Sequence, residues 1–334
     1  MNTFQTIVLG IFAFFIIAGL IVIATVKAKG DVPPTALTIW GTVSQDAVTP
    51  LISEFFDSDT LAITYQPFSP ETFDQELIEA LAASRGPDMV LLPAELLLRY
   101  RDKIVTIPFA TYSERLFRDT FIQGAELFLA PDGIYALPFS VDPLVMYYNR
   151  DMLEAGGFTA APRFWDEFLA LGAKLTRRDA SGNISRSAVA LGEYRNIAAS
   201  TEIIAAMFIQ SGNRIVDRDG RGVFYSVLAQ SSAPAVLDFY TEFANPLKPS
   251  YSWNRAQPSS RSAFLASRLA IYFGFGSEYS ALRQGNPNLN FDVTFFPGPR
   301  SDNELGITYG KLTGIAILRS SLSPSAALGA AFPA

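Results

Sequence analysis

The body of the chain opens with short hydrophobic runs that alternate with longer, spaced patterns. The runs have the length of buried strands and fall at 37–40, 61–65 and 89–92. Between them, apolar residues recur three and four positions apart, as on one face of a helix, over 45–57 and again from Ser69 to Gly86. Ser69 is the expected N-cap of the second helix, and Pro70 is its expected first helical residue. This β-α-β-α-β order predicts parallel strands joined by right-handed crossovers.

A later stretch, residues 134–155, combines a long apolar run with a polar end. The run extends almost unbroken from Ile134 to Tyr148 and is interrupted in its middle by two prolines and Asp142. This predicts two short buried strands that meet at a Pro-bounded bend, followed by a helix that starts at the Asn149–Asp151 cluster. Such a bend can carry the chain from one lobe into another. A hairpin inside a single domain fits the local pattern equally well.

The remainder of the chain continues the alternation of helices and strands. Helices are expected at 113–122, 164–175, 201–211 and 233–244, strands at 270–273, 291–296 and 313–318, and a last helix from Ser323. The turn at 217–222 resembles a calcium loop at first sight, but it lacks the fifth-position Asp or Asn and the closing Glu. A plain hairpin is therefore predicted there.

Residues 1–30 are predicted to form a membrane anchor. The segment from Ile7 to Val26 contains no charged residue in twenty positions, and about 30 Å of helix of this kind is enough to cross a bilayer. No basic segment precedes this long apolar core, which favours an uncleaved transmembrane helix over a secretory signal peptide. Cleavage at Val26-Lys27-Ala28 is the alternative. Lys27 and Lys29 on the C-terminal flank favour a cytoplasmic body under the positive-inside rule.

Composition bounds the class of protein and excludes several chemistries. At 334 residues the chain is longer than one ordinary core, so two lobes or domains are expected. The 26 basic and 32 acidic residues give a net charge of −6, and we expect no nucleic-acid partner. The chain has no Cys and no His, which excludes disulfides, thiolate nucleophiles, Cys/His metal sites and the Ser-His-Asp triad. We expect no metal, no cofactor and no catalytic residue.

Parallel sheets bind ligands beyond the carboxyl ends of their strands. In the predicted sheet these positions are Trp40–Thr42 and Pro93–Glu95. The alternatives are a core aromatic residue for Trp40 and a helix N-terminal charge for Glu95.

Several short motifs follow one another along most of the body. They are Leu37-Thr38-Ile39-Trp40-Gly41, Gly86-Pro87-Asp88-Met89-Val90, Ile134-Tyr135-Ala136-Leu137-Pro138, Tyr147-Tyr148-Asn149-Arg150-Asp151, Pro162 with Trp165-Asp166-Glu167-Phe168, Phe264–Gly276, Phe291–Pro297, and Tyr309-Gly310 with Gly314-Ile315-Ala316. In this order and spacing, over residues 36–332, the chain resembles the family-1 extracellular solute-binding proteins. These are the maltose-binding-protein-like components of ABC importers.

The resemblance implies an α/β fold of the two-lobed periplasmic-binding-protein type (type II), in which hinge strands join lobes that close around a solute. It places the first lobe at 31–142 with 299–334 and the second at 143–298, with hinges near Ser140–Pro143 and Pro297–Ile307. It also implies a body outside the cytoplasmic membrane, whereas Lys27 and Lys29 beside the anchor favour a cytoplasmic body. The implied function is that of a monomeric receptor that delivers a small solute, a sugar or oligosaccharide being expected, to ABC permease subunits.

The resemblance also carries over a set of ligand-binding positions, residue by residue. They are Trp40, Gly41 and Thr42 after the first strand, Glu95 after the third, Asp142 at the hinge, Tyr251 and Trp253 in a loop of the second lobe, Phe275, Gly276 and Ser277 after that lobe's later strand, and Tyr309 and Lys311 where the chain re-enters the first lobe. Carboxylates at such positions accept hydrogen bonds from sugar hydroxyls, and aromatic faces stack on pyranose rings. A solvated charge is the alternative for Lys311.

The chain departs from the family pattern in two places. Ser277 stands where the family often has a tryptophan, so one stacking platform is expected to be missing. Family members usually continue past the helix that begins at Ser323, so a truncated or shortened form is expected.

Two other functions stay open. One is a carbohydrate-processing enzyme that uses two of Asp142, Glu95 and Glu278 as acid and base, and the other is a surface-anchored sensor domain without a role in transport.

Overall fold

The computed structural model describes residues 34–55, 61–212, 215–218, 224–226, 233–300 and 306–331. They form two compact units. Unit 1 holds the described residues up to Ser140 and from Leu312 onward, and unit 2 holds those from Val141 to Lys311. The chain thus changes unit at the start of the expected first hinge, and again a few residues beyond the expected second hinge. The lobe boundaries at 142/143 and 298/299 remain predictions.

The predicted anchor at 7–26 lies outside the described residues. Within the described ranges, no helix combines the length and the apolar character that a membrane-spanning segment needs. The anchor therefore stays a prediction from the sequence.

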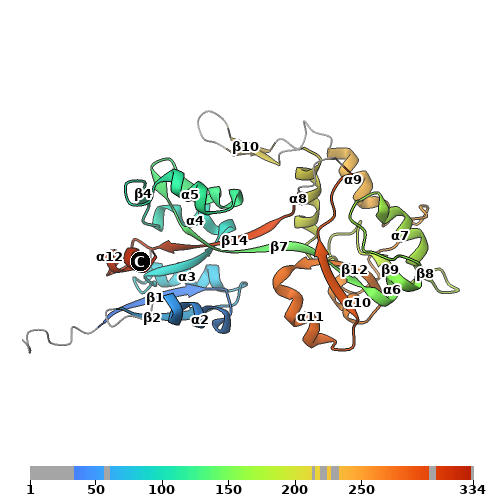
Figure 1. Ribbon diagram of the computed structural model, residues 1–334, viewed down its shortest axis with the longest axis horizontal. Helices are drawn as coiled ribbons and strands as arrows, with labels where there is room; N and C mark the ends of the chain where they lie inside the picture. The colour runs from blue at the N-terminus through green and yellow to red at the C-terminus, as the bar shows by residue number, and fades with distance from the viewer. Residues whose placement is uncertain are drawn as a thin grey trace, which may run out of the picture. The chain divides into compact units, whose positions relative to one another are not determined.

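The sheet of unit 1 has the strand order β2-β1-β3-β14. Its strands are β1 (Thr35–Gly41), β2 (Leu61–Pro67), β3 (Met89–Pro93) and β14 (Gly310–Ile317). β1 pairs in parallel with both β2 and β3, which confirms the prediction, and β14 returns antiparallel to β3. The crossovers are α2 (Gln45–Phe55) and α3 (Phe73–Ala82), as Figure 1 shows.

α3 begins later than the sequence pattern predicted. Residues 70–72 form a turn, and Phe73 is the first helical residue. The Ser69 hydroxyl bonds to the Thr72 hydroxyl at 3.3 Å instead of capping the helix. The predictions of Ser69 as N-cap and Pro70 as first helical residue are therefore wrong, because this hydroxyl is used inside the turn.

The rest of unit 1 consists of short elements and a last helix. They are α4 (Leu97–Tyr100), α5 (Glu114–Thr120), β4 (Ile107–Pro108), β5 (Leu129–Ala130), β6 (Gly133–Ile134), α12 (Pro324–Ala331) and 3₁₀ turns at Ala94–Leu96, Arg101–Lys103 and Gln123–Phe128. Leu37 and Ile39 of β1 are buried while Ala36 and Thr38 are exposed, so β1 has one core face. Residues Met89–Leu92 of β3 are all buried, as expected of a central strand covered on both faces.

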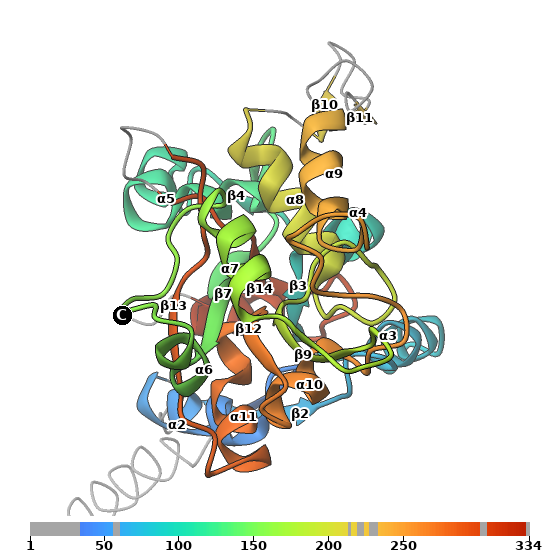
Figure 2. The ribbon, with the colours of Figure 1, turned by 90° about the vertical axis from the view of Figure 1, so that its right-hand side faces the viewer.

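The sheet of unit 2 has the strand order β7-β12-β9-β8. Its strands are β7 (Leu137–Asn149), β12 (Leu269–Phe275), β9 (Ile184–Val189), β8 (Arg177–Arg178) and β13 (Phe291–Phe295), which pairs with the second half of β7. The helices are α6 (Arg150–Ala155), α7 (Glu167–Leu175), α8 (Ser200–Gln210), α9 (Ala233–Glu242), α10 (Ser260–Leu265) and α11 (Tyr279–Gly285). α7 packs on β9 and α10 on β12 (Figure 2). β10 (Val216–Arg218) and β11 (Phe224–Ser226) pair antiparallel, as the predicted hairpin requires, and residues 219–223 of its turn lie outside the described residues.

β7 is one strand of 13 residues, where the sequence predicted two strands meeting at a bend. Pro143 is tolerated because the ladders to β12 and β13 begin only at Leu144 and Val145, so its missing N–H costs neither of them a hydrogen bond. The helix predicted after β7 is present. The Asn149 side chain accepts the Met152 N–H at 3.0 Å and caps α6.

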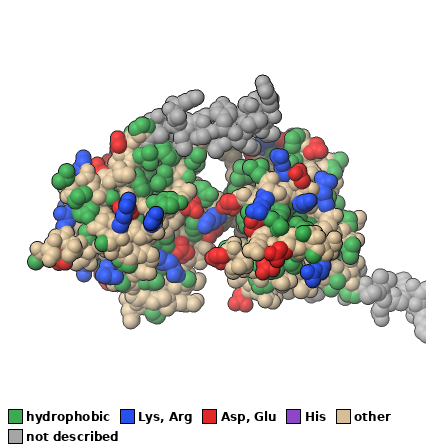
Figure 3. Space-filling view, turned by 180° about the vertical axis from the view of Figure 1, so that it is seen from behind, with side chains coloured by type: hydrophobic (Ala, Val, Ile, Leu, Met, Phe, Trp, Pro, Cys, Tyr) green, Lys and Arg blue, Asp and Glu red, His purple; other side chains and the backbone are tan. Residues whose placement is uncertain are grey.

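Aromatic residues dominate the core of unit 2. The Tyr147 ring lies between 5.9 and 6.5 Å from the rings of Phe264, Tyr272 and Phe291, and such pairs each contribute about 0.5–1.5 kcal/mol beyond their buried area. Outside the core, acidic and basic side chains occur on the visible face of both units with apolar side chains between them (Figure 3). Neither sign of charge forms a face of its own in that view.

Candidate functional site

The strand directions in unit 2 define one edge of its sheet as the place for a ligand. β9 and β12 are parallel, so their carboxyl ends meet at the same edge. β7 is antiparallel to β12, and its Leu144 pairs with Phe275 at the end of β12. Residues just before Leu144 and just after Phe275 are therefore neighbours at the edge where α/β sheets bind ligands.

Asp142 and Ser277, both predicted ligand-binding residues, are in direct contact at this edge. Ser277 donates its backbone N–H to Asp142 Oδ1 at 2.9 Å and its hydroxyl to Asp142 Oδ2 at 2.6 Å. A Cβ on Gly276 would lie 3.5 Å from the same carboxylate, so glycine keeps this side open. A carboxylate has about four lone-pair positions, and Asp142 can thus accept further hydrogen bonds from a solute.

The buried Tyr147 and the half-buried Glu278 hold the loop that carries Gly276 and Ser277. The Tyr147 hydroxyl donates to the Phe275 carbonyl at 2.7 Å. The Glu278 carboxylate accepts the Phe275 N–H at 2.9 Å and the Tyr272 hydroxyl at 2.7 Å. Burial, with the charges of Glu278 and Asp142, raises the pKa of Tyr147, so its hydroxyl remains a donor at neutral pH. The loop is therefore fixed before a solute arrives.

Phe275, Tyr309 and Lys311 lie together beside this loop. The Lys311 Nζ stands 3.9 Å from the centroid of the Phe275 ring, a cation–π contact, and the Tyr309 ring meets Phe275 edge-on at 6.5 Å. Phe275 is buried, so its ring supports Lys311 and offers little face for stacking on a sugar. Lys311 itself is exposed.

The predicted residues of unit 1 follow β1 and β3. Trp40 is half-buried and its ring packs on Phe68 at 4.5 Å. Gly41 is required at its position, because an added Cβ would come within 2.8 Å of Leu91 Cβ and 2.9 Å of the Tyr65 hydroxyl. That hydroxyl donates to the Val43 carbonyl at 2.6 Å, and burial raises the pKa of Tyr65 to about 12.

Thr42 and Glu95 complete the group in unit 1. Thr42 is half-buried directly after β1, and Glu95 is exposed in the turn directly after β3. Because β1 and β3 are parallel, all four predicted residues of this unit lie at the carboxyl edge of its sheet.

Tyr251 and Trp253, two further predicted residues, offer little free surface to a solute. Trp253 is completely buried and donates its indole N–H to the Asn196 side chain at 3.1 Å, so it offers no surface to a solute. The Tyr251 ring is covered by the Arg178 guanidinium at 4.9 Å, and its hydroxyl accepts from Asn254 at 2.7 Å. We leave both residues out of the proposed site.

Sequence reasoning missed the segment that follows β9. Tyr194 is 64% exposed there, accepts a hydrogen bond from the Thr201 hydroxyl at 3.3 Å and, through its carbonyl, one from Ser200. Asn196 holds this segment, since its side-chain amide donates to the Asn254 and Gln257 carbonyls at 2.9 and 3.0 Å. The rule that ligands bind beyond strand ends, applied to β9, would have found it.

The chemistry of the ligand edge is that of binding. Both oxygens of Asp142 and both oxygens of Glu278 already accept hydrogen bonds, and Arg261 lies 3.3 Å from Glu278. These two carboxylates are therefore engaged as acceptors rather than poised as a general acid and base. Among the residues that the structure describes, no cluster of three acidic side chains could hold a metal ion.

Comparison with known proteins gives one family and one fold. A family model described as bacterial extracellular solute-binding protein matches residues 52–332. Curated relatives from Brucella abortus and Brucella suis, described as binding proteins, are 28% identical over 130 residues. That match covers 37% of this chain and 31% of each relative, about a third of the relatives' length.

Solved structures show the same fold at low sequence identity. The sugar-binding protein MalE from Xanthomonas citri has a TM-score of 0.67 and 20% identity, over 89% of this chain and 74% of that one. The galacto-N-biose/lacto-N-biose I-binding protein of Bifidobacterium longum has a TM-score of 0.66 and 17% identity, over 91% and 75%. A substrate-binding protein from Listeria monocytogenes in complex with cycloalternan has a TM-score of 0.65 and 17% identity, over 89% and 74%.

Proposed function

Because this chain belongs to the bacterial extracellular solute-binding proteins, we propose that it is the solute receptor of an ABC-type importer and that its solute is a sugar or an oligosaccharide. The family match supports the predicted resemblance and the binding role. The choice of a saccharide is supported by the solutes named for proteins of similar fold, which include lacto-N-biose and cycloalternan.

The observation that carries the proposal is the contact between Asp142 and Ser277 beside Gly276. A carboxylate that is fixed by two donors, with lone pairs left over and no side chain at the neighbouring residue, suits the hydroxyl groups of a sugar. Tyr194, in the segment that follows the carboxyl end of β9, supplies an exposed aromatic ring, and such rings stack on pyranose faces. It is our candidate for the platform that Ser277 does not provide.

The proposed ligand-binding residues fall into two groups, one in each unit. Unit 2 contributes Asp142, Gly276, Ser277, Tyr309, Lys311 and the added Tyr194, with Phe275 as support. Unit 1 contributes Trp40, Gly41, Thr42 and Glu95 by the same criterion of strand ends. No observation favours the enzyme alternative, since Glu278 holds its own loop and Asp142 is engaged by Ser277.

A panel experiment tests binding against turnover. Thermal unfolding is measured with sugars, oligosaccharides, polyols and phosphorylated glycerol compounds, and each mixture is analysed by chromatography afterwards. We expect at least one saccharide to stabilise the protein, by about 2.7 kcal/mol at a hundredfold excess over its Kd, and to be recovered unchanged. Conversion of the saccharide would support the enzyme instead. If no compound of the panel stabilised the protein, the proposed receptor function would be contradicted.

We further propose that residues 1–30 anchor a monomeric body outside the cytoplasmic membrane, next to its permease subunits. The charge-free segment from Ile7 to Val26 supports the anchor, and the family supports the extracytoplasmic side. The full chain should sediment with membranes, be digested by protease added to spheroplasts, and enter the soluble fraction when residues 1–30 are deleted. Protection from the added protease would contradict this orientation, and co-purification with permease subunits from neighbouring genes tests the partner.

A further inference from the structure

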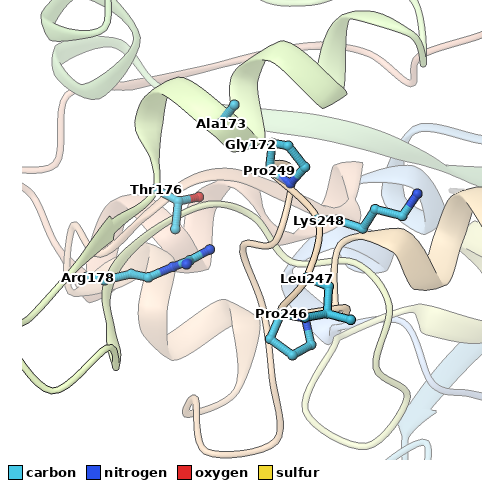
Figure 4. A pocket seen from close by; sticks show the side chains of 8 residues that line it. All are labelled: Gly172, Ala173, Thr176, Arg178, Pro246, Leu247, Lys248 and Pro249. Carbon is cyan, nitrogen blue, oxygen red and sulfur yellow. The ribbon is translucent and has the colours of Figure 1, made fainter.

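A cavity of about 500 Å³ opens in unit 2, away from the ligand edge of its sheet. It is lined by Gly172, Ala173, Thr176, Arg178 and the loop residues Pro246, Leu247, Lys248 and Pro249 (Figure 4). Arg178 pairs with Ile184, the first residue of β9, so this wall stands at the amino end of that strand. The candidate solute site lies at its carboxyl end, and the cavity is therefore a separate feature.

The walls of this cavity are held firmly. A Cβ on Gly172 would lie 2.6 Å from the Ser250 carbonyl oxygen, so α7 and the loop meet backbone to backbone. Asn245 accepts the Leu247 N–H through its side chain and the Lys248 N–H through its carbonyl, both at 3.0 Å. Two prolines in the loop restrict it further. The cavity thus exists before any ligand binds.

Arg178 is a cation at this cavity that forms no ion pair with a described carboxylate. Its guanidinium lies 4.9 Å over the Tyr251 ring and makes one long hydrogen bond, 3.4 Å, to the Tyr251 carbonyl. No ion pair found between described residues involves it. Figure 4 shows the guanidinium reaching toward the middle of the lining residues, whereas the Lys248 side chain extends outward. Most of the donors of Arg178 are left for a ligand.

Thr176 gives a second, independent indication. Its hydroxyl is the one buried side-chain polar atom without a hydrogen-bond partner in the described part of the chain. Buried polar groups of this kind are costly and call for an explanation, such as a missing partner. The hydroxyl points toward the same cavity (Figure 4).

The C-terminus of α7, where the helix dipole is negative, does not repel an anion bound in this cavity. Arg177 donates to the Lys174 carbonyl at 2.5 Å and to the Thr176 carbonyl at 3.2 Å, so carbonyl groups at this helix end already have a cationic partner. The polar side chains that face the cavity, Arg178 and Thr176, are both donors. The side chains of Ala173, Pro246, Leu247 and Pro249 add apolar surface to the lining.

We propose that this cavity is a second binding site, for a small organic carboxylate with an apolar body. The planar guanidinium of Arg178 matches a carboxylate in two parallel hydrogen bonds, and the Thr176 hydroxyl donates a third. The apolar side chains of Ala173, Pro246, Leu247 and Pro249 contact the body of the molecule. This site does not depend on the solute proposed for the ligand edge.

Calorimetric titration with benzoate tests the site on the full chain at low ionic strength, with benzamide as the neutral molecule of the same shape. We expect benzoate to bind at least tenfold more tightly than benzamide or inorganic phosphate. Arg178→Gln should weaken benzoate at least tenfold and Thr176→Val several-fold. Thr176→Val should unfold at the same or a higher temperature than the parent, because it removes a hydroxyl that has no partner.

Arg186→Gln is the matched control, since Arg186 is exposed on β9 and does not line the cavity. It should leave benzoate affinity within twofold of the parent, and so should Asp142→Asn at the other edge of the sheet. Equal losses of benzoate affinity in Arg178→Gln and Arg186→Gln would show that benzoate is held only by general charge attraction, and would overturn the proposal. Equal binding of benzoate and inorganic phosphate, or of benzoate and benzamide, would overturn it as well.

Discussion

Ser277 holds the Asp142 carboxylate with two hydrogen bonds, one from its backbone N–H and one from its hydroxyl, at 2.9 and 2.6 Å. The contact joins residues 135 positions apart and ties β7, just before its pairing with β12 begins at Leu144, to the loop after β12. Because both donors come from one residue, the carboxylate is oriented before a solute binds. Preorganisation of this kind lowers the entropic cost of binding.

Ser277→Ala should weaken solute binding several-fold and lower the free energy of unfolding by about 0.5–1.5 kcal/mol, the usual value of one hydrogen bond. The backbone N–H still holds one carboxylate oxygen, so the loss is partial. Titration calorimetry and urea unfolding measure the two effects. Ser280→Ala, at an exposed position of α11, is the control, and identical behaviour of the two variants would refute the role of the hydroxyl.

Asn196→Ala should lower the free energy of unfolding by about 2–3 kcal/mol, because it leaves the buried Trp253 indole N–H without an acceptor. It should also weaken solute binding, since Asn196 holds the segment that carries Tyr194. Urea unfolding followed by tryptophan fluorescence checks the first effect. Asn288→Ala, in an exposed turn, should change neither quantity, and a loss below about 0.5 kcal/mol in Asn196→Ala would contradict the assignment.

Gly172→Ala should destabilise the protein by about 1–3 kcal/mol through overpacking. The new Cβ would meet the Ser250 carbonyl oxygen at 2.6 Å and its Cα at 2.9 Å, and both are backbone atoms. Gly329→Ala is the matched change in α12, where an added Cβ meets nothing within 4 Å. It should be neutral or stabilising, because Ala favours a helix over Gly. Thermal unfolding that ranks the two variants in the opposite order would contradict the packing.

Stability should fall in alkaline solution because several tyrosine hydroxyls are harder to ionise in the folded chain. Burial raises the pKa of Tyr65 to about 12. Burial likewise raises the pKa values of Tyr100, Tyr147, Tyr240 and Tyr272. The unfolded chain releases these protons from about pH 10, so the stabilisation is complete below pH 10 and is lost as pH rises toward each folded pKa, at about 1.4 kcal/mol per pH unit per tyrosine.

Urea unfolding at a series of pH values between about 8 and 11 measures this slope. Tyr65→Phe should make the decline of stability with pH less steep, because one tyrosine no longer contributes its part of the slope. Tyr194→Phe removes an exposed hydroxyl and should leave the slope unchanged. A stability that stays flat through pH 11, or equal slopes in both variants, would show that burial of these hydroxyls is not what limits the alkaline range.

Much of the fold could be predicted because its signals are local. The strands and crossovers of unit 1 follow from apolar spacing over a few residues, and the Asn149 cap follows from its place before Met152. The start of α3 could not be predicted, since the Ser69 hydroxyl had a second partner in Thr72. The continuous β7 could not either, because pairing with distant strands decides whether a proline interrupts a ladder.

The candidate site depended more on long-range contacts. Trp253 has the same sequence context whether it lines a cleft or fills a core, and its burial is linked to Asn196, 57 positions away. Asp142 and Ser277 came from the family resemblance, while nothing local indicated their contact. Tyr194 follows β9, which the sequence pattern did not predict as a strand, although the carboxyl end of β9 obeys the same rule as those of β1 and β12.

Calorimetric titration of stabilising saccharides into the parent chain, Asp142→Asn and Ser280→Ala tests the central claim most directly. We expect at least one saccharide to bind the parent and Ser280→Ala equally, to be recovered unchanged, and to bind Asp142→Asn at least tenfold more weakly, by about 1.4 kcal/mol or more. Equal affinity in the parent and Asp142→Asn would contradict a solute site built on Asp142 and Ser277.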